Sequence, residues 1–180
     1  IYYEGRYVKK DMRLSIYYFT LAAKQKHSES QFYLGLIFLK HNPQAAIYFL
    51  TLSSNQNNPR AQYLLGYINY SKKDYKKAIY YLTSSANQNY PQALTLIGII
   101  YYRNNDLDKS IYYFKLASDL KEPNSLFNLG FIYFENKILQ NIDKAVYYFT
   151  LAAKENQRPA QMFLGMIYFN KSFGLFDIDK

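Results

Sequence analysis

The sequence predicts an all-α solenoid, a stack of antiparallel helix pairs that repeat along the chain. Three observations lead to this fold class: a five-residue block that returns five times, a glycine that follows each block at a fixed distance, and a helix-capping residue before each block. The three features keep the same order in every copy. Five copies in register are therefore interpreted as five structural repeats.

The repeated block consists of a small residue, Ile or Val, a tyrosine, a second aromatic residue, and Phe or Leu. Its copies occupy residues 15–19, 46–50, 78–82, 110–114 and 145–149. A glycine preceded by Leu or Ile lies 16 residues after the end of each copy, at Gly35, Gly66, Gly98, Gly130 and Gly165. These glycines are 31, 32, 32 and 35 residues apart. The variation falls in one connection per repeat, as expected of a loop at one face of the stack.

Each repeat is predicted to contain a helix A, which carries the glycine, and a helix B, which carries the block. The residue four positions before each block is Asp or Asn, whose side-chain oxygen can accept a hydrogen bond from a free backbone N–H at a helix start. The five predicted caps are Asp11, Asn42, Asp74, Asp106 and Asn141. They place the start of each helix B.

The opposite ends of the helices carry matching signals. A proline falls at the start of helix A in four repeats, where a first-turn proline is tolerated; these are Pro59, Pro91, Pro123 and Pro159. Helix B is followed by an asparagine suited to the left-handed conformation at Asn57, Asn89 and Asn156. A glycine inside helix A costs about 1 kcal/mol relative to alanine. Its recurrence predicts that helix B approaches too closely for a side chain.

Composition bounds the classes of protein that the chain can belong to. The 180 residues carry a net charge of +9 and contain 22 tyrosines, 13 phenylalanines and no cysteine. The lack of cysteine excludes disulfides and thiolate chemistry and leaves the compartment open, with the cytoplasm slightly favoured. No apolar run reaches the roughly 18 residues of a membrane span, and no leader segment follows Ile1. The aromatic rings are expected to form the core or to line a binding surface.

The order of the motifs resembles the tetratricopeptide pattern and, more closely, the Sel-one-like repeat, a subclass of those solenoids. Residues 2–11, Tyr-x-x-Gly-x-Tyr-Val-x-x-Asp, are similar to the connection of that family, with Tyr7 where its second glycine usually stands. Residues 144–153, Lys-Ala-x-x-Tyr-Phe-x-x-Ala-Ala, and residues 160–165 are similar to its helix B and the next helix A. The resemblance covers essentially the whole chain. It implies a right-handed superhelical stack that serves as a scaffold or adaptor for other proteins.

Both ends of the chain align with the interior of a repeat. Residues 1–4 match residues 132–135 in helix A, and residues 177–180 match residues 141–144, where helix B begins. Solenoids normally end in atypical capping repeats. The sequence therefore predicts one solenoid segment over residues 1–180, with about five repeats, cut inside a repeat at both ends and belonging to a longer protein.

No catalytic, cofactor or metal site is predicted. His27 and His41 fall in predicted loops of different repeats, without a second ligand at a metal-like spacing. No phosphate-binding glycine loop and no nucleophile elbow is present. Asp106 and Asp108 are interpreted as a cap and a first-turn acid that complement a helix dipole. The chain is therefore predicted not to be an enzyme.

By resemblance, helix A lines a concave groove at positions three before each glycine and one, four and five after it. These positions include Phe32, Leu36, Leu39, Tyr63, Tyr67, Tyr70, Thr95, Ile99, Tyr102, Arg103, Phe127, Phe131, Phe134, Met162, Met166 and Phe169. The surface is largely aromatic and is predicted to hold a peptide or a partner helix. The same rings could instead form the core between repeats. The core is favoured for the Phe and Leu positions, and the groove for Tyr63, Tyr67, Tyr70 and Tyr102, whose hydroxyls need water or a partner.

A cluster of lysines marks the turn between helices A and B of one repeat, at Lys72, Lys73, Lys76 and Lys77. It is interpreted as a solubilising edge, or alternatively as a docking strip for an acidic protein or an anionic membrane.

Two other functions stay open. Basic two-helix repeats can read single-stranded RNA, but the predicted groove offers few cations, Arg60, Arg103 and Lys40, so nucleic acid is the less favoured partner. The segment could also be a regulatory interaction module of a larger enzyme such as a protein kinase. In that role it would still act by binding.

Overall fold

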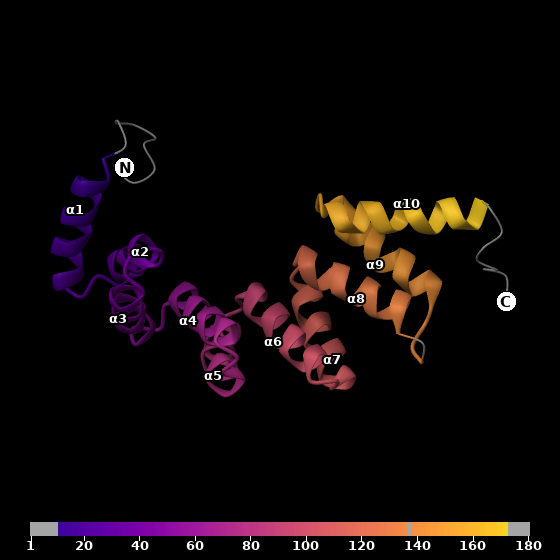
Figure 1. Ribbon diagram of the computed structural model, residues 1–180, viewed down its shortest axis with the longest axis horizontal. Helices are drawn as coiled ribbons and strands as arrows, with labels where there is room; N and C mark the ends of the chain where they lie inside the picture. The colour runs from indigo at the N-terminus through magenta and orange to yellow at the C-terminus, as the bar shows by residue number, and fades with distance from the viewer. Residues whose placement is uncertain (1–10, 137, 173–180) are drawn as a thin grey trace. The chain divides into compact units, whose positions relative to one another are not determined.

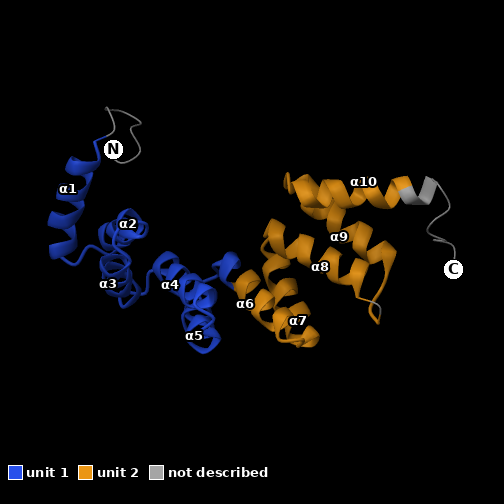
Figure 2. Ribbon diagram, in the orientation of Figure 1, with its two compact units in different colours: residues 1–93 blue, residues 94–180 orange. Residues whose placement is uncertain are grey.

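The computed structural model describes residues 11–136 and 138–172, which form ten α-helices and no β-strand (Figure 1). The chain divides into two compact units, residues 1–93 and residues 94–180 (Figure 2). The all-α architecture of successive helix pairs that the repeats predict is confirmed.

The helices alternate between the B type, which carries the repeated block, and the A type, which carries the glycine. The B helices are α1 (Met12–Lys24), α3 (Pro43–Ser54), α5 (Tyr75–Ala86), α7 (Leu107–Asp119) and α9 (Ile142–Lys154). The A helices are α2 (Ser28–Phe38), α4 (Pro59–Ser71), α6 (Pro91–Arg103), α8 (Pro123–Glu135) and α10 (Arg158–Ser172). Isolated helices of this length are marginal in water, so packing between helices supplies most of their stability.

Every B helix begins at the cap residue that the sequence predicts. The Asp11 carboxylate accepts hydrogen bonds from the backbone N–H groups of Arg13 and Leu14 at 2.9 and 3.0 Å. In the other B helices the cap side chain accepts one hydrogen bond, from the backbone N–H three residues further on; these caps are Asn42, Asp74, Asp106 and Asn141. Each acceptor satisfies a backbone N–H that has no partner inside its own helix.

The turns between helices also contain the proline and asparagine features that the sequence predicts. Prolines occupy the first or second position of α4, α6, α8 and α10, at Pro59, Pro91, Pro123 and Pro159. Asn57, Asn89 and Asn156 have φ angles of 59°, 58° and 60°. This is the left-handed region, which asparagine enters more readily than most residues because its short polar side chain can hydrogen-bond locally.

In the first unit, helix B reaches the glycine of helix A, as predicted. A Cβ atom on Gly35 would lie 2.6 Å from Cγ of Leu50, and a Cβ atom on Gly66 would lie 2.6 Å from Cγ of Leu82. Both leucines are the last residue of a repeated block and are fully buried. The last residue of the block and the glycine therefore form one contact between helix B and helix A.

In the second unit, phenylalanine takes the place of leucine in this contact. A Cβ atom would lie 2.7 Å from Cδ1 of Phe114 at Gly98, and 2.6 Å from Cδ1 of Phe149 at Gly130. The explanation does not extend to Gly165. Beyond the adjacent residues and the nearby backbone of α10, no heavy atom of the described residues lies within 4 Å of a Cβ atom placed there. Residues 177–180, which align with the start of a further helix B, lie outside the described residues.

A cluster of phenylalanine rings surrounds Phe149, which is fully buried in α9. The centroid of its ring lies 5.7 Å from that of Phe127 and 6.4 Å from that of Phe134, both in α8. The ring of Phe163 in α10 stacks on it at 5.2 Å. Offset ring contacts of this kind add to the stability gained by burying the rings.

Polar side chains also link the helices, both within a pair and between neighbouring pairs. Gln56 donates a hydrogen bond to Gln31 at 2.6 Å, and Gln88 donates one to Gln62 at 2.8 Å. In the second unit, the Glu122 carboxylate accepts hydrogen bonds from the Thr95 hydroxyl at 2.8 Å and from the backbone N–H of Ser125 at 2.7 Å. Glu122 is buried and caps α8. These contacts satisfy polar groups that would otherwise be costly to bury.

Candidate protein-binding surface

In the first unit, the predicted groove residues Tyr63, Tyr67 and Tyr70 share one face of α4, because they are spaced by four and three residues. The Tyr67 ring is 48% exposed, whereas Tyr63 and Tyr70 are half-buried. The Tyr70 ring contacts those of Tyr67 and Tyr75, with centroid distances of 6.5 and 6.1 Å. The Tyr63 ring lies 5.3 Å from Tyr90. The rings support one another and leave Tyr67 accessible to solvent.

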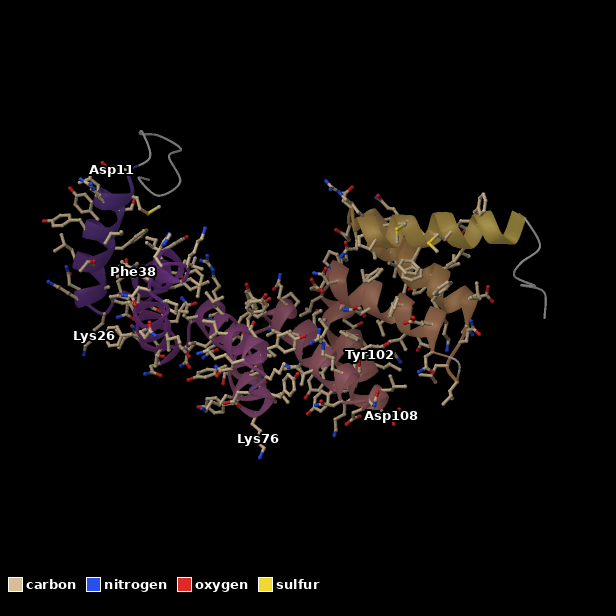
Figure 3. All side chains as sticks on the ribbon, viewed as in Figure 1. Asp11, Lys26, Phe38, Lys76, Tyr102 and Asp108 are labelled. Atoms are coloured by element: carbon tan, nitrogen blue, oxygen red, sulfur yellow. The ribbon has the colours of Figure 1, made fainter. Side chains whose placement is uncertain are left out.

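In the second unit, an apolar pocket with a volume of about 310 Å³ opens between α6 and α8. Five of its lining residues are predicted groove positions, namely Ile99, Tyr102, Arg103, Phe127 and Phe131. Three others were not predicted, namely Phe114, Asn128 and Ile132. Figure 3 labels Tyr102, which lies at the C-terminal end of α6. Most of the lining is aliphatic or aromatic, and Arg103 is its cation.

The phenylalanines of α8 divide between this pocket and the core. Phe127 and Phe131 line the pocket, and each also lies 5.8 Å from the ring of Phe163, centroid to centroid. Phe134 does not line the pocket, and its ring packs against Phe149 and Phe163 at 6.4 and 5.5 Å. Phe127 and Phe131 therefore belong to both the pocket and the core, whereas Phe134 belongs to the core.

The remaining predicted groove positions differ widely in exposure. Phe32 is buried, with the Arg60 guanidinium 4.2 Å above its ring centroid. Thr95 is buried as well, beside Glu122. By contrast, the described A helix nearest the C-terminus exposes Met162, Met166 and Phe169. Leu36 and Leu39 are half-buried. A fixed register relative to the glycine therefore does not give a uniform surface.

The four predicted edge lysines, Lys72, Lys73, Lys76 and Lys77, are exposed at the turn between α4 and α5. The Lys76 side chain extends from α5 away from the rest of the unit (Figure 3). The ammonium group of Lys77 lies 3.3 Å from the Asp74 carboxylate. The backbone N–H of Lys77, and then its ammonium group, hold the pKa of Asp74 below its usual value.

Acid is expected to weaken the first unit through Asp74. Because the folded-state pKa lies below the unfolded value near 3.8, the stabilisation is complete above that value and is lost as the pH falls through the folded pKa. Asparagine keeps a capping oxygen but cannot be protonated in this range. The melting temperature of Asp74→Asn should therefore fall less than that of the wild type between pH ~5 and ~2. Equal falls in the two proteins would contradict the prediction.

A row of exposed tyrosines on the B helices was missed by the sequence analysis. The third residue of each block is 56–69% exposed: Tyr17, Tyr48, Tyr80, Tyr112 and Tyr147. The first residue of every block is buried, as is the fifth in four of the five. Successive helical residues are rotated by roughly 100°, so the third position faces the opposite side. The exposure of the third residue could therefore have been predicted from the block alone.

The fourth residue of the block is half-buried in four of the five copies, whereas Tyr18 in the first copy is exposed. The ring of Tyr113 stacks on Tyr101 at 5.5 Å, and that of Tyr148 stacks on Tyr133 at 5.8 Å. Partial burial raises the pKa of both the Tyr113 and the Tyr148 phenol. Neighbouring tyrosines in one block therefore have different roles.

Residues 11–136 and 138–172 contain no metal-binding cluster and no membrane-spanning helix. No group of three His, Asp or Glu side chains in this range is arranged to hold a metal ion. His27 caps α2, with Nδ1 3.3 Å from the backbone nitrogen and 2.8 Å from the hydroxyl oxygen of Ser30. In the same part of the chain, no helix combines the length and apolarity needed to cross a bilayer.

The paired helices and the accessible apolar surface define a helical-repeat protein. The sequence profile of the Sel1 repeat matches six consecutive segments, residues 1–27, 28–58, 59–90, 92–122, 123–157 and 158–170. The chain belongs to the Sel1 repeat family, in agreement with the resemblance noted in the sequence. Proteins of this family are generally non-catalytic scaffolds for protein interactions.

Solved structures with the same fold support this assignment. The chain is similar to c5321, a protective antigen of uropathogenic Escherichia coli, with a TM-score of 0.84 and 30% identity. This similarity covers 94% of the chain and 39% of that protein. A Sel1 repeat protein from Oxalobacter formigenes gives a TM-score of 0.83 at 26% identity, over 93% of the chain and 74% of that protein. MamA, at 24% identity and a TM-score of 0.60, over 81% of the chain and 89% of that protein, shares the fold. A comparison with curated protein sequences gives no match.

Proposed function

We propose that the chain binds a peptide or a partner helix through the A helices, with the pocket between α6 and α8 as the principal anchor site. The observation that carries the proposal is the apolar lining of this pocket, which includes Ile99, Phe127 and Phe131. Its volume of about 310 Å³ is at the small end of ligand pockets, which span roughly 300–1,000 Å³. A pocket of this size suits one or two large apolar side chains of a partner.

The polar groups of the pocket would set the orientation of the bound segment. Arg103 and Asn128 supply hydrogen-bond donors beside the apolar wall. Tyr102 adds a ring together with a hydroxyl group. A buried apolar anchor with a few polar groups around it is the usual composition of an energetic hot spot. In the first unit, Tyr63, Tyr67 and Tyr70 are proposed to add aromatic contacts of the same kind.

The proposal is tested by selecting peptides from a random display library against the whole chain and measuring the affinity of the selected peptides. Tyr102→Ser and Arg103→Ser are each expected to weaken binding about tenfold or more, because hot-spot truncations cost about 2 kcal/mol or more and 1.4 kcal/mol is tenfold. Tyr67→Ser is expected to have a smaller effect. The matched control is Tyr112→Ser, which removes an exposed tyrosine of α7 that does not line the pocket.

Circular dichroism establishes first that each variant is folded. Selected peptides should share a large apolar residue, and binding should change little between low and moderate salt. If Lys76→Ser/Lys77→Ser abolishes binding while Tyr102→Ser leaves it unchanged, the basic edge is the binding surface and the pocket proposal is wrong. Steep weakening with salt would point the same way.

A further inference from the structure

A second cleft, in the first unit, differs in chemistry from the apolar pocket. It has a volume of about 590 Å³ and lies between the turn that follows α3 and the C-terminal half of α5. Its lining residues are Ser54, Asn55, Asn57, Gln62, Tyr80, Tyr81, Ser84, Asn87 and Gln88. Every one carries a hydroxyl or a carboxamide group. The cleft is thus uncharged and rich in hydrogen-bonding groups.

The absence of charge from this lining contrasts with the rest of the unit. Residues 1–93 contain 12 of the 22 basic residues of the chain and 4 of its 13 acidic residues. None of these lines the cleft among the described residues. The cleft also adjoins the C-terminal ends of α3 and α5, whose carbonyl groups carry partial negative charge. Such a site offers little to a phosphate or a carboxylate.

Two tyrosines form the aromatic wall of the cleft. Tyr80 is 69% exposed, the highest value in the row of B-helix tyrosines. The Tyr81 ring meets it edge to face, with centroids 5.2 Å apart and an interplanar angle of 75°. Tyr81 packs against the buried core cluster that contains Leu50, Ala61 and Leu65. An exposed ring braced by a fixed one presents a flat apolar face beside polar groups.

The floor of the cleft is held in place by hydrogen bonds. The buried Gln62 accepts a hydrogen bond from Gln88 and donates one to the carbonyl oxygen of Ser54 at 3.4 Å. Gln88 also donates to the carbonyl oxygen of Ser84 at 3.3 Å. Both N–H groups of its amide are therefore engaged within the protein, and its side-chain oxygen is left as an acceptor. The floor thus presents polar groups in fixed directions.

The rim carries further polar groups that face solvent. The side chains of Asn55, Asn57 and Asn87 line the cleft, and all three residues are exposed. Each can both donate and accept. The backbone of Asn57 is fixed in the left-handed conformation, with φ of 59°. Donors and acceptors at the rim, an aromatic face and no charge together match the surface of a sugar ring, which has hydroxyl groups at its edge and C–H groups on its faces.

We infer that this cleft binds a neutral saccharide, with a pyranose ring against Tyr80 and its hydroxyl groups hydrogen-bonded to the amides of Asn55, Asn57 and Asn87. An apolar side chain would leave these amides without partners, which is costly. An anionic ligand would find no cation. The site is separate from the pocket between α6 and α8, so its test does not depend on the proposed function.

The inference is tested by saturation-transfer difference NMR on the whole chain with maltotriose, cellotriose and chitotriose. At least one of these neutral trisaccharides is expected to bind with a Kd below about 10 mM. Tyr80→Ala should weaken that binding about tenfold or more. Since Tyr80 is exposed, this variant should keep its fold. The matched control is Tyr112→Ala, at the equivalent position of α7 and outside the cleft, which should bind as the wild type does.

A second variant distinguishes the amide rim from the aromatic wall. Asn57→Gly removes the amide but keeps a residue that readily adopts a positive φ, and it too should weaken binding. The acidic trigalacturonic acid should bind more weakly than the neutral sugars. The inference is overturned if none of the three neutral sugars binds, if neither Tyr80→Ala nor Asn57→Gly affects binding, or if the acidic sugar binds more tightly.

Discussion

Replacing Gly130 with alanine is expected to lower the free energy of unfolding by about 2 kcal/mol, because the new methyl group would overpack the core. It would lie 2.6 and 2.7 Å from Cδ1 and Cε1 of Phe149. Phe149 cannot easily yield, since its ring is fully buried against Phe127, Phe134 and Phe163. Alanine favours the helix by about 1 kcal/mol over glycine, which offsets part of the cost. Urea denaturation followed by circular dichroism measures the net change.

The same substitution at Gly165 is expected to raise the free energy of unfolding instead of lowering it. Apart from the adjacent residues and the nearby backbone of α10 itself, no heavy atom of the described residues lies within 4 Å of the added methyl group there. The helix preference of alanine then acts alone, and the protein should gain up to about 1 kcal/mol. Equal effects at Gly130 and Gly165 would show that contact with helix B is not the reason for the glycine.

Replacing Glu122 with alanine is expected to lower the free energy of unfolding by about 3 kcal/mol, since buried hydrogen bonds to a charged group are worth roughly 1.5–3 kcal/mol each. The carboxylate of this residue caps α8 through Ser125 and accepts hydrogen bonds from Thr95 and Asn124, all within 2.8 Å. The backbone N–H of Ser125 would be left without this acceptor in a fully buried position. The midpoint of urea denaturation should shift accordingly.

Glutamine at position 122 is the matched control. It has nearly the same shape and keeps one oxygen that can accept the hydrogen bond from Ser125. A loss well below that of Glu122→Ala is therefore expected. If both variants lose the same amount, the charge of the carboxylate matters more than the cap. If neither loses stability, the three hydrogen bonds contribute nothing net.

The helices and their starts could be predicted because their causes are local in the sequence. An Asp or Asn at a fixed distance before a block caps a helix whatever lies around it, and all five predicted caps are confirmed. The contact between glycine and block was predictable for a different reason. Glycine is unfavourable inside a helix, so a recurring glycine requires a steric cause, and Leu50, Leu82, Phe114 and Phe149 supply it.

The candidate sites were less predictable, because they depend on which neighbouring side chains leave space. Phe131 and Phe134 lie one turn apart on α8, yet Phe131 lines the pocket and Phe134 does not. No rule based on spacing from the glycine separates them. The polar cleft was missed because most of its amides lie in turns, where Asn and Gln are typical turn residues and do not by themselves indicate a ligand. The exposure of Tyr80 could have been predicted from a helical projection of the block.

The contacts of each helix also bear on how the chain reaches its folded state. In the first unit α2 packs on α3 and α4 on α5, and in the second unit α8 packs on α9, so the main partners of a helix are its neighbours in sequence. Closing such short loops costs little conformational entropy. Chains dominated by local contacts fold fast. A helix pair could therefore form while the rest of the polypeptide is still being synthesised, before distant segments exist to compete for its apolar face.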